Sequence, residues 1–132
     1  MKLLLDTHIW LRALGSPEAL SRQVRRHLDH PGNQLYLSPI SVWEAGHLVR
    51  KKRVRIKTAF PDWLRESLSH MPVEEAPLNF AVAAEVSRIH LPQGDLGDLF
   101  LAATASVFDL TLVTQDTQLL GCKWLKTLAN GQ

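Results

Sequence analysis

The stretch KLLLDTHIWLRAL, residues 2–14, decides the fold because it contains two different hydrophobic patterns, one before and one after the polar residue Asp6. The three consecutive leucines before Asp6 predict a short strand that is buried on both faces, as in the interior of a parallel sheet. After Asp6 the apolar residues follow helical spacing as far as Leu14, and Gly15 ends this expected helix. A buried strand that passes directly into a helix is typical of an α/β protein.

The same alternation of strand and helix continues along the chain. Further strands are expected over 35–37, 72–76 and 110–113, with an edge strand over 122–125 and a frayed tail over 129–132. Further helices are expected over 16–28, 40–52, 79–89 and 95–108, and one more begins at Pro61. Because parallel strands need long, usually helical connections, we predict the α/β class: a single three-layer α/β/α sandwich with a central parallel sheet, residues 1–132 forming one domain.

Composition agrees with one compact domain. The chain has 132 residues, of which 45% are hydrophobic and 21% are charged. No apolar run approaches the roughly 20 residues that span a bilayer, so no membrane segment is expected. The single cysteine, Cys122, excludes an internal disulfide and a multi-cysteine metal site, and we expect a cytoplasmic location. The four tryptophans, Trp10, Trp43, Trp63 and Trp124, are expected in the core.

The net charge of +2 hides an uneven distribution, because six of the 15 lysines and arginines lie within residues 50–57. This basic segment consists of Arg50, Lys51, Lys52, Arg53, Arg55 and Lys57. The other nine basic residues face 13 acidic ones, a balance of −4. The basic segment could track a phosphate backbone or an acidic partner. The alternative is a solvated helix end, where basic side chains meet the negative end of the helix dipole.

Five acidic residues are expected at one edge of the sheet. Asp6 and Asp116 each follow a strand, Glu44 lies on the helix after the second strand, and Asp95 and Asp98 begin the 95–108 helix. In parallel sheets, ligands bind beyond the carboxyl ends of the strands. Clustered carboxylates repel one another and must take up protons or a cation. Oxygen ligands without cysteine or a zinc motif favour Mg²⁺ or Mn²⁺.

Each acid also has a purely structural interpretation. Asp6 and Asp116 are suited to helix N-caps or turns, and Asp95 and Asp98 have the spacing of a capping arrangement. Ser41 and Glu44 match the capping box, in which the glutamate reaches back to the serine amide. Against this, Glu44 shares a helical stripe with apolar residues, so its ionised side chain needs a partner.

Several enzyme classes are excluded by the first turn. It has no glycine to cradle a pyrophosphate or a nucleoside triphosphate, and His8 stands where haloacid-dehalogenase-like phosphatases need a second aspartate. The chain also has no GxSxG elbow for acyl transfer. Metal-assisted phosphoryl chemistry is the class of reaction that these features do not exclude.

Four segments together resemble the PIN domain. They are LLLDTH at 3–8, SPISVWE at 38–44, GDLGDLFLAATA at 94–105 and LVTQD at 112–116. Their order and spacing cover essentially the whole chain, and they look most like the VapC ribonuclease toxins of bacterial toxin–antitoxin pairs. The resemblance implies the same α/β/α fold that periodicity predicts.

The resemblance also implies site residues and partners. It assigns an acidic, metal-binding catalytic site to Asp6, Glu44, Asp98 and Asp116, with Asp95 and Thr114 in support. Asp6 and Asp98 would be direct ligands of one or two Mg²⁺ ions, with Mn²⁺ a possible substitute, and a metal-activated water would cleave an RNA phosphodiester. Glu44 and Asp116 are both candidates for the general base. A homodimer and a cognate antitoxin that blocks the site are also implied, and the basic segment becomes a candidate contact for RNA or antitoxin.

The sequence departs from the family pattern at Leu96 and Leu99, where proline and arginine are frequent. Because this arginine is missing, a catalytically silent module that binds RNA or protein is an alternative function. A phosphotransfer enzyme, such as a phosphatase or a response-regulator-like receiver, is a further alternative, since it shares the strand-end aspartate. A receiver would need a paired acid and a lysine that this sequence does not show.

Overall fold

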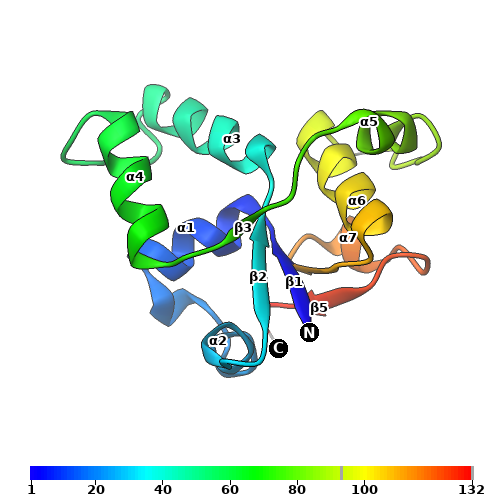
Figure 1. Ribbon diagram of the computed structural model, residues 1–132, viewed down its shortest axis with the longest axis horizontal. Coiled ribbons are helices and arrows are strands. Elements are labelled where there is room, and N and C mark those ends of the chain that lie inside the picture. Colours follow the sequence, from blue (N-terminus) through cyan, green and yellow to red (C-terminus); the bar gives the residue numbers. More distant parts are fainter. Residues whose placement is uncertain (93, 132) are drawn as a thin grey trace.

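The computed structural model describes residues 1–92 and 94–131, and in this part of the chain it contains one sheet of five parallel strands. The strands are β1 (Lys2–Leu5), β2 (Gln34–Leu37), β3 (Glu74–Glu75), β4 (Thr111–Thr114) and β5 (Thr127–Ala129). Their spatial order is β3-β2-β1-β4-β5, so the first strand of the sequence lies at the centre of the sheet (Figure 1). The predicted parallel sheet is confirmed.

Helices cover both faces of this sheet. They are α1 (Thr7–Gly15), the short 3-10 helix η1 (Pro17–Ala19), α2 (Arg22–Asp29), α3 (Pro39–Arg50), α4 (Phe60–His70), α5 (Phe80–Val86), α6 (Leu96–Phe108) and α7 (Thr117–Leu120). In Figure 1, α1, α3 and α4 lie on one side of the strands, and α5, α6 and α7 lie on the other. The three-layer α/β/α prediction is therefore confirmed. Among the helices described, none has both the length and the apolar character needed to cross a membrane.

The alternating side chains of β1 divide the core in two. Leu4 packs on one face with the helix α6 through residues such as Leu101. Leu3 and Leu5 point to the opposite face and pack with Trp10 of α1. All three leucines of β1 are 0% exposed, which is the two-sided burial that their uninterrupted apolar run predicts.

Two expected elements differ from the structure, and one observed helix was not expected. The helix predicted over 16–28 is divided, because Ser21 rather than Ser16 caps α2, its hydroxyl accepting a hydrogen bond from the Val24 amide at 3.2 Å. The edge strand predicted over 122–125 is wrong, since β5 forms at Thr127–Ala129 and pairs with β4. The four-residue helix α7 was not predicted, and Asp116 caps it.

The end of the described chain is held in place rather than frayed at Asn130, whereas Gln132 lies outside the described residues. The Asn130 side chain is buried, and its amide oxygen accepts a hydrogen bond from the Ser21 amide at 2.7 Å. Its amide nitrogen donates to the Ala19 carbonyl at 3.4 Å and to Gln115 Oε1 at 3.1 Å. One side chain thus joins β5, the start of α2 and the turn after β4.

We expect Asn130→Ala to lower the free energy of unfolding by about 1–3 kcal/mol, because it leaves partly buried polar groups without partners. Urea denaturation measures the change. The control is Arg65→Ala, which removes an exposed ion pair with Asp62 and should cost less than about 1 kcal/mol. Equal losses in the two variants would contradict a bracing role for Asn130.

Candidate active site

The five expected carboxylates line one hollow at the carboxyl edge of the sheet. The hollow has a volume of about 430 Å³, and its acidic lining consists of Asp6, Glu44, Asp95, Asp98 and Asp116. Asp6 follows β1, Asp116 follows β4 through Gln115, Glu44 is on α3, and the other two begin α6. We call this feature the acid hollow. As the side chains stand in the described residues, no three acids, histidines or cysteines are close enough to form a ready-made metal cage.

Thr114 connects the two strand-end aspartates. Its hydroxyl is fully buried at the end of β4 and donates to Asp6 Oδ2 at 2.6 Å. The same hydroxyl accepts a hydrogen bond from the Asp116 amide at 3.1 Å. Although Asp6 occupies the N-cap position of α1, its side chain makes no capping hydrogen bond. The capping interpretation is therefore wrong for the Asp6 carboxylate, which Thr114 orients instead.

Capping does account for some of the hydrogen bonds that two other acids, Asp116 and Asp95, accept. Asp116 Oδ1 accepts hydrogen bonds from the amides of Gln118 at 2.9 Å and Leu119 at 3.1 Å. Asp95 Oδ1 accepts one from the Asp98 amide at 2.8 Å. Each cap uses Oδ1, so it fixes the carboxylate in place while both side chains still line the acid hollow. Capping and lining the hollow are compatible in these residues.

Glu44 is held by a hydroxyl from another helix and does not close a capping box. Ser38, not Ser41, is the N-cap of α3, accepting a hydrogen bond from the Ile40 amide at 3.1 Å. The Thr7 hydroxyl donates to Glu44 Oε1 at 2.6 Å and lies 2.8 Å from Ser41 Oγ. Burial raises the pKa of Glu44, the Thr7 hydrogen bond opposes this, and the neighbouring charges of Asp95 and Asp6 raise it further.

Two contributors to this geometry were not predicted, namely Thr7 and Gly97. A Cβ atom at Gly97 would lie 2.7 Å from Glu44 Oε2 and 3.3 Å from Asp95 Oδ1. Glycine therefore allows the first turn of α6 to approach the carboxylate of α3 this closely. The available sequence signals were the position of Thr7 directly after Asp6 and a glycine directly before Asp98.

Asp98 is perturbed by burial and by the neighbouring like charges. Burial, followed by the charges of Asp95 and Asp116, raises the pKa of Asp98 to about 6. A bound cation would remove this penalty, and an all-oxygen donor set suits Mg²⁺ or Mn²⁺ better than softer metals. The chemistry of the donors thus fits a divalent cation.

The basic segment lies outside the acid hollow. Arg50 ends α3, and the remaining residues to Lys57 connect α3 with α4. All six of its basic side chains are exposed. Arg55 also lines a separate pocket beside α1.

The prediction that every tryptophan is in the core is wrong for two of them. Trp43, next to Glu44, is 59% exposed, and Trp124 is 51% exposed. The Trp43 ring stacks on the His47 imidazole one helical turn away, with ring centroids 5.3 Å apart.

Comparison with known proteins agrees with this architecture. The sequence model of the PIN domain matches residues 3–121. A search of curated protein sequences finds no match. Among solved structures, a chain of VapBC2 from Rickettsia felis bound to a promoter DNA fragment is 22% identical, with a TM-score of 0.75, and the match covers 98% of this chain and 99% of that one.

Two further structures show the same fold. A chain of DNA-bound VapBC from Salmonella typhimurium is 15% identical with a TM-score of 0.71, and 98% of each chain is covered. A chain of a toxin–antitoxin complex from Klebsiella pneumoniae is 19% identical with a TM-score of 0.68, and 96% of each chain is covered.

The five-stranded parallel sheet, with helices on both faces and the acid hollow at its carboxyl edge, defines a three-layer α/β/α protein. More particularly, the chain belongs to the PIN domain family, which confirms the resemblance carried by the four sequence segments.

Asp98→Asn should change the pH dependence of stability. Because the folded-state pKa of Asp98 lies above its ordinary value, the stabilising protonated form is present in full below about pH 4 and is lost as the pH rises through about 6. The displaced pKa corresponds to about 3 kcal/mol, which solvent screening of this half-exposed group reduces to about 1–2 kcal/mol.

In EDTA we therefore expect Asp98→Asn to exceed wild type in unfolding free energy by about 1–2 kcal/mol at pH 7, and the two to converge near pH 4. Urea titrations at both pH values measure this difference. The control Asp29→Asn removes an exposed carboxylate outside the acid hollow. A pH-independent difference for Asp98→Asn would contradict the raised pKa.

Proposed function

We propose that this chain is a metal-dependent ribonuclease and the toxin of a type II toxin–antitoxin pair. The observation that carries the proposal is the convergence of five carboxylates on one hollow in a chain of the PIN domain family. The similarity to chains of VapBC complexes supports the toxin assignment and an antitoxin as partner. We further propose that the protein forms a homodimer and that its substrate is RNA.

In this proposal Asp6, Glu44, Asp98 and Asp116 hold Mg²⁺, for which Mn²⁺ is a plausible substitute. When bound, the cation would supply Lewis-acid polarisation of the phosphodiester and make a water molecule more acidic. Asp95 fixes the first turn of α6 through its hydrogen bond to the Asp98 amide. Thr114 orients Asp6 and holds the backbone at Asp116.

Glu44 is the better candidate for the group that takes a proton from the attacking water. Its pKa is raised, so its carboxylate binds a proton more readily than an ordinary glutamate. Asp116 is less suited, because its Oδ1 already accepts two amide hydrogen bonds as the cap of α7. Thr7 would position Glu44 through its 2.6 Å hydrogen bond.

The catalytically silent module is the competing candidate, and Leu99 is the observation that favours it. This residue stands where the family pattern often has arginine. Cleavage of cellular RNA by the purified protein distinguishes the two functions.

The test is cleavage of total cellular RNA by the purified protein with Mg²⁺, with EDTA, and as the Asp6→Asn, Asp98→Asn variant. We expect discrete fragments with Mg²⁺ that disappear in EDTA and fall by about 100-fold or more in the variant, because the cation loses two carboxylates. Sequencing of the fragment ends identifies the cleaved bond.

The matched control is the Asp29→Asn, Asp62→Asn variant, which removes two exposed carboxylates outside the acid hollow and should cleave like wild type. The absence of cleavage by folded wild type with both Mg²⁺ and Mn²⁺ contradicts the ribonuclease and favours the silent module.

Gly97→Ala tests the position of Glu44. The added methyl group would displace a flexible carboxylate rather than backbone, so we expect unchanged thermal unfolding and a kcat lowered by about 10- to 100-fold. In the control Gly121→Ala the new Cβ meets only backbone oxygens, the nearest at 3.4 Å, which is ordinary contact. Full activity of Gly97→Ala would rule out a need for this geometry.

A further inference from the structure

A second pocket borders the acid hollow at α1. Its volume is about 670 Å³, and it is formed by α1, residues 54–56 and α4. His8, in the first turn of α1, lines both this pocket and the acid hollow. The two sites are therefore neighbours that share a side chain.

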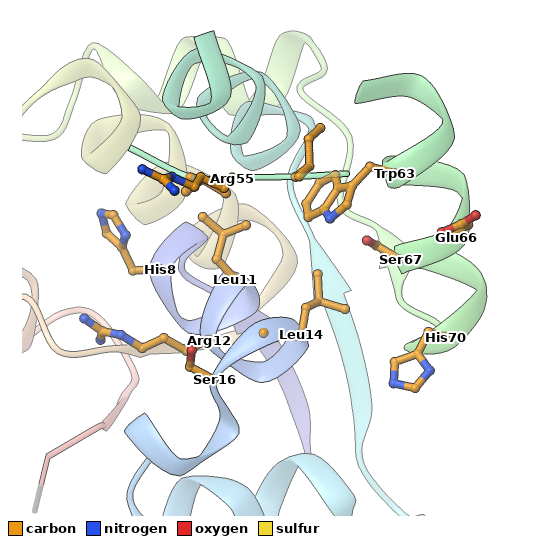
Figure 2. Close-up of a pocket in the computed structure, with 13 residues that line it drawn as sticks. His8, Leu11, Arg12, Leu14, Ser16, Arg55, Trp63, Glu66, Ser67 and His70 are labelled. Carbon is orange, nitrogen blue, oxygen red and sulfur yellow. The ribbon is translucent and has the colours of Figure 1, made fainter. Parts of the chain in front are cut away.

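One side of this pocket carries basic groups. Figure 2 shows His8, Arg12 and Arg55 along the same side, with the Arg55 guanidinium extending toward the His8 ring and the Arg12 guanidinium lying below it. His8 and Arg12 are four residues apart on α1 and so share a helix face. Arg12 Nη1 donates a hydrogen bond to Gln115 Oε1, and Gln115 lines the acid hollow. The basic side is thus the side that borders the acid hollow.

The middle of the pocket is apolar. Figure 2 places Leu11 and Leu14 there, with Trp63 beside them. Trp63 is held by aromatic contacts, since its ring centroid lies 5.6 Å from that of Trp10 and 5.5 Å from that of Phe60. A pocket with a basic border and a fixed apolar floor suits a ligand that has both an anionic group and a flat, weakly polar group.

A nucleotide unit has this chemistry. Its phosphate matches the guanidinium groups, which hydrogen-bond to phosphate oxygens, and its base matches an apolar or aromatic surface. A pocket of this size also falls in the range of about 300–1,000 Å³ that is usual for small-ligand sites.

We propose that this pocket binds the nucleotide of an RNA strand that adjoins the phosphodiester in the acid hollow, with Arg12 and Arg55 on its phosphate. The proposal rests on the proposed ribonuclease function, and it names the substrate subsite. It also gives Arg55 a distinct role within the basic segment and adds Arg12, which lies outside that segment.

The negative charge of the acid hollow explains why a neighbouring cationic subsite would help RNA to bind. Five carboxylates around the acid hollow repel a polyanion, so an RNA strand needs cations close by if its scissile phosphate is to enter. Arg12 and Arg55 supply two permanent positive charges at that border. The subsite therefore contributes to binding of the strand and not to the chemical step.

The experiment measures KM and kcat for a short RNA that contains the mapped cleavage site, with Arg12→Gln, Arg55→Gln and the double variant. We expect KM to rise about 5- to 20-fold per substitution, with kcat within about 2-fold of wild type. The salt dependence of log kcat/KM should lose about 0.7 in slope for each charge removed, and Arg12→Lys should restore it.

The matched control is Arg25→Gln, an exposed arginine on α2 that should leave KM and the salt slope unchanged. Binding is measured separately by fluorescence anisotropy, with the same RNA and the Asp6→Asn, Asp98→Asn protein in EDTA, where no cleavage interferes. Arg12→Gln and Arg55→Gln in this background should raise Kd by a similar factor. Thermal unfolding establishes that each variant is folded.

The outcomes separate the two proposals. Cleavage of RNA by wild type, with RNA binding and KM unaffected by the arginine substitutions, overturns the subsite and leaves the ribonuclease intact. Absence of cleavage by wild type contradicts the ribonuclease, and anisotropy with a short single-stranded RNA of mixed sequence then decides whether the pocket binds RNA. If the substitutions weaken only the complex with the antitoxin protein, the pocket is a protein-docking surface and the RNA subsite is overturned.

Discussion

Burial of β1 on both faces constrains the geometry of the acid hollow. Leu3, Leu4 and Leu5 are 0% exposed, and they pack alternately into the two helical layers. A slip of one residue in register would exchange the two packed faces, so the strand has one stable position. This fixes the point at which β1 ends, and Thr114 then joins the following residue, Asp6, to the end of the adjacent strand β4.

The acid hollow opposes its own assembly, and hydrogen bonds offset part of this cost. Two carboxylates about 4 Å apart repel by roughly 4 kcal/mol at an effective dielectric near 20. Hydroxyl groups of Thr7 and Thr114 and the amides at the starts of α6 and α7 stabilise four of the five acids. Burial, together with the repulsion that remains, raises the pKa of Asp98. Local stability is thus given up where acidic side chains are brought together.

The sequence predicted the features that depend on local pattern. The leucines of β1 and the apolar spacing of α1 and α6 are strong signals, and they placed the acids correctly beyond the strands. The boundary of α2 was missed because Ser16-Pro17 and Ser21 offer competing start signals. The helix α7 is too short to show periodicity, and the serine–glutamate spacing of a capping box also occurs inside a helix, as it does at Ser41. The exposure of Trp43 and the approach of Gly97 to Glu44 depend on how α3 and α6 pack, which no local pattern contains.

The contacts that complete and support the acid hollow join residues that lie far apart in the sequence. Thr114 is 108 residues from Asp6, Gln115 is 103 residues from Arg12, and Asn130 is 109 residues from Ser21. Contacts of such long sequence separation form late in folding, because closing long loops costs entropy before any contact is gained. A nascent chain emerging from the ribosome already carries Asp6 and Glu44 but lacks the residues that hold Asp6 in place. Translation past Thr114 and Asp116 must therefore precede assembly of the site, which delays any activity of the acid hollow until these residues have been made.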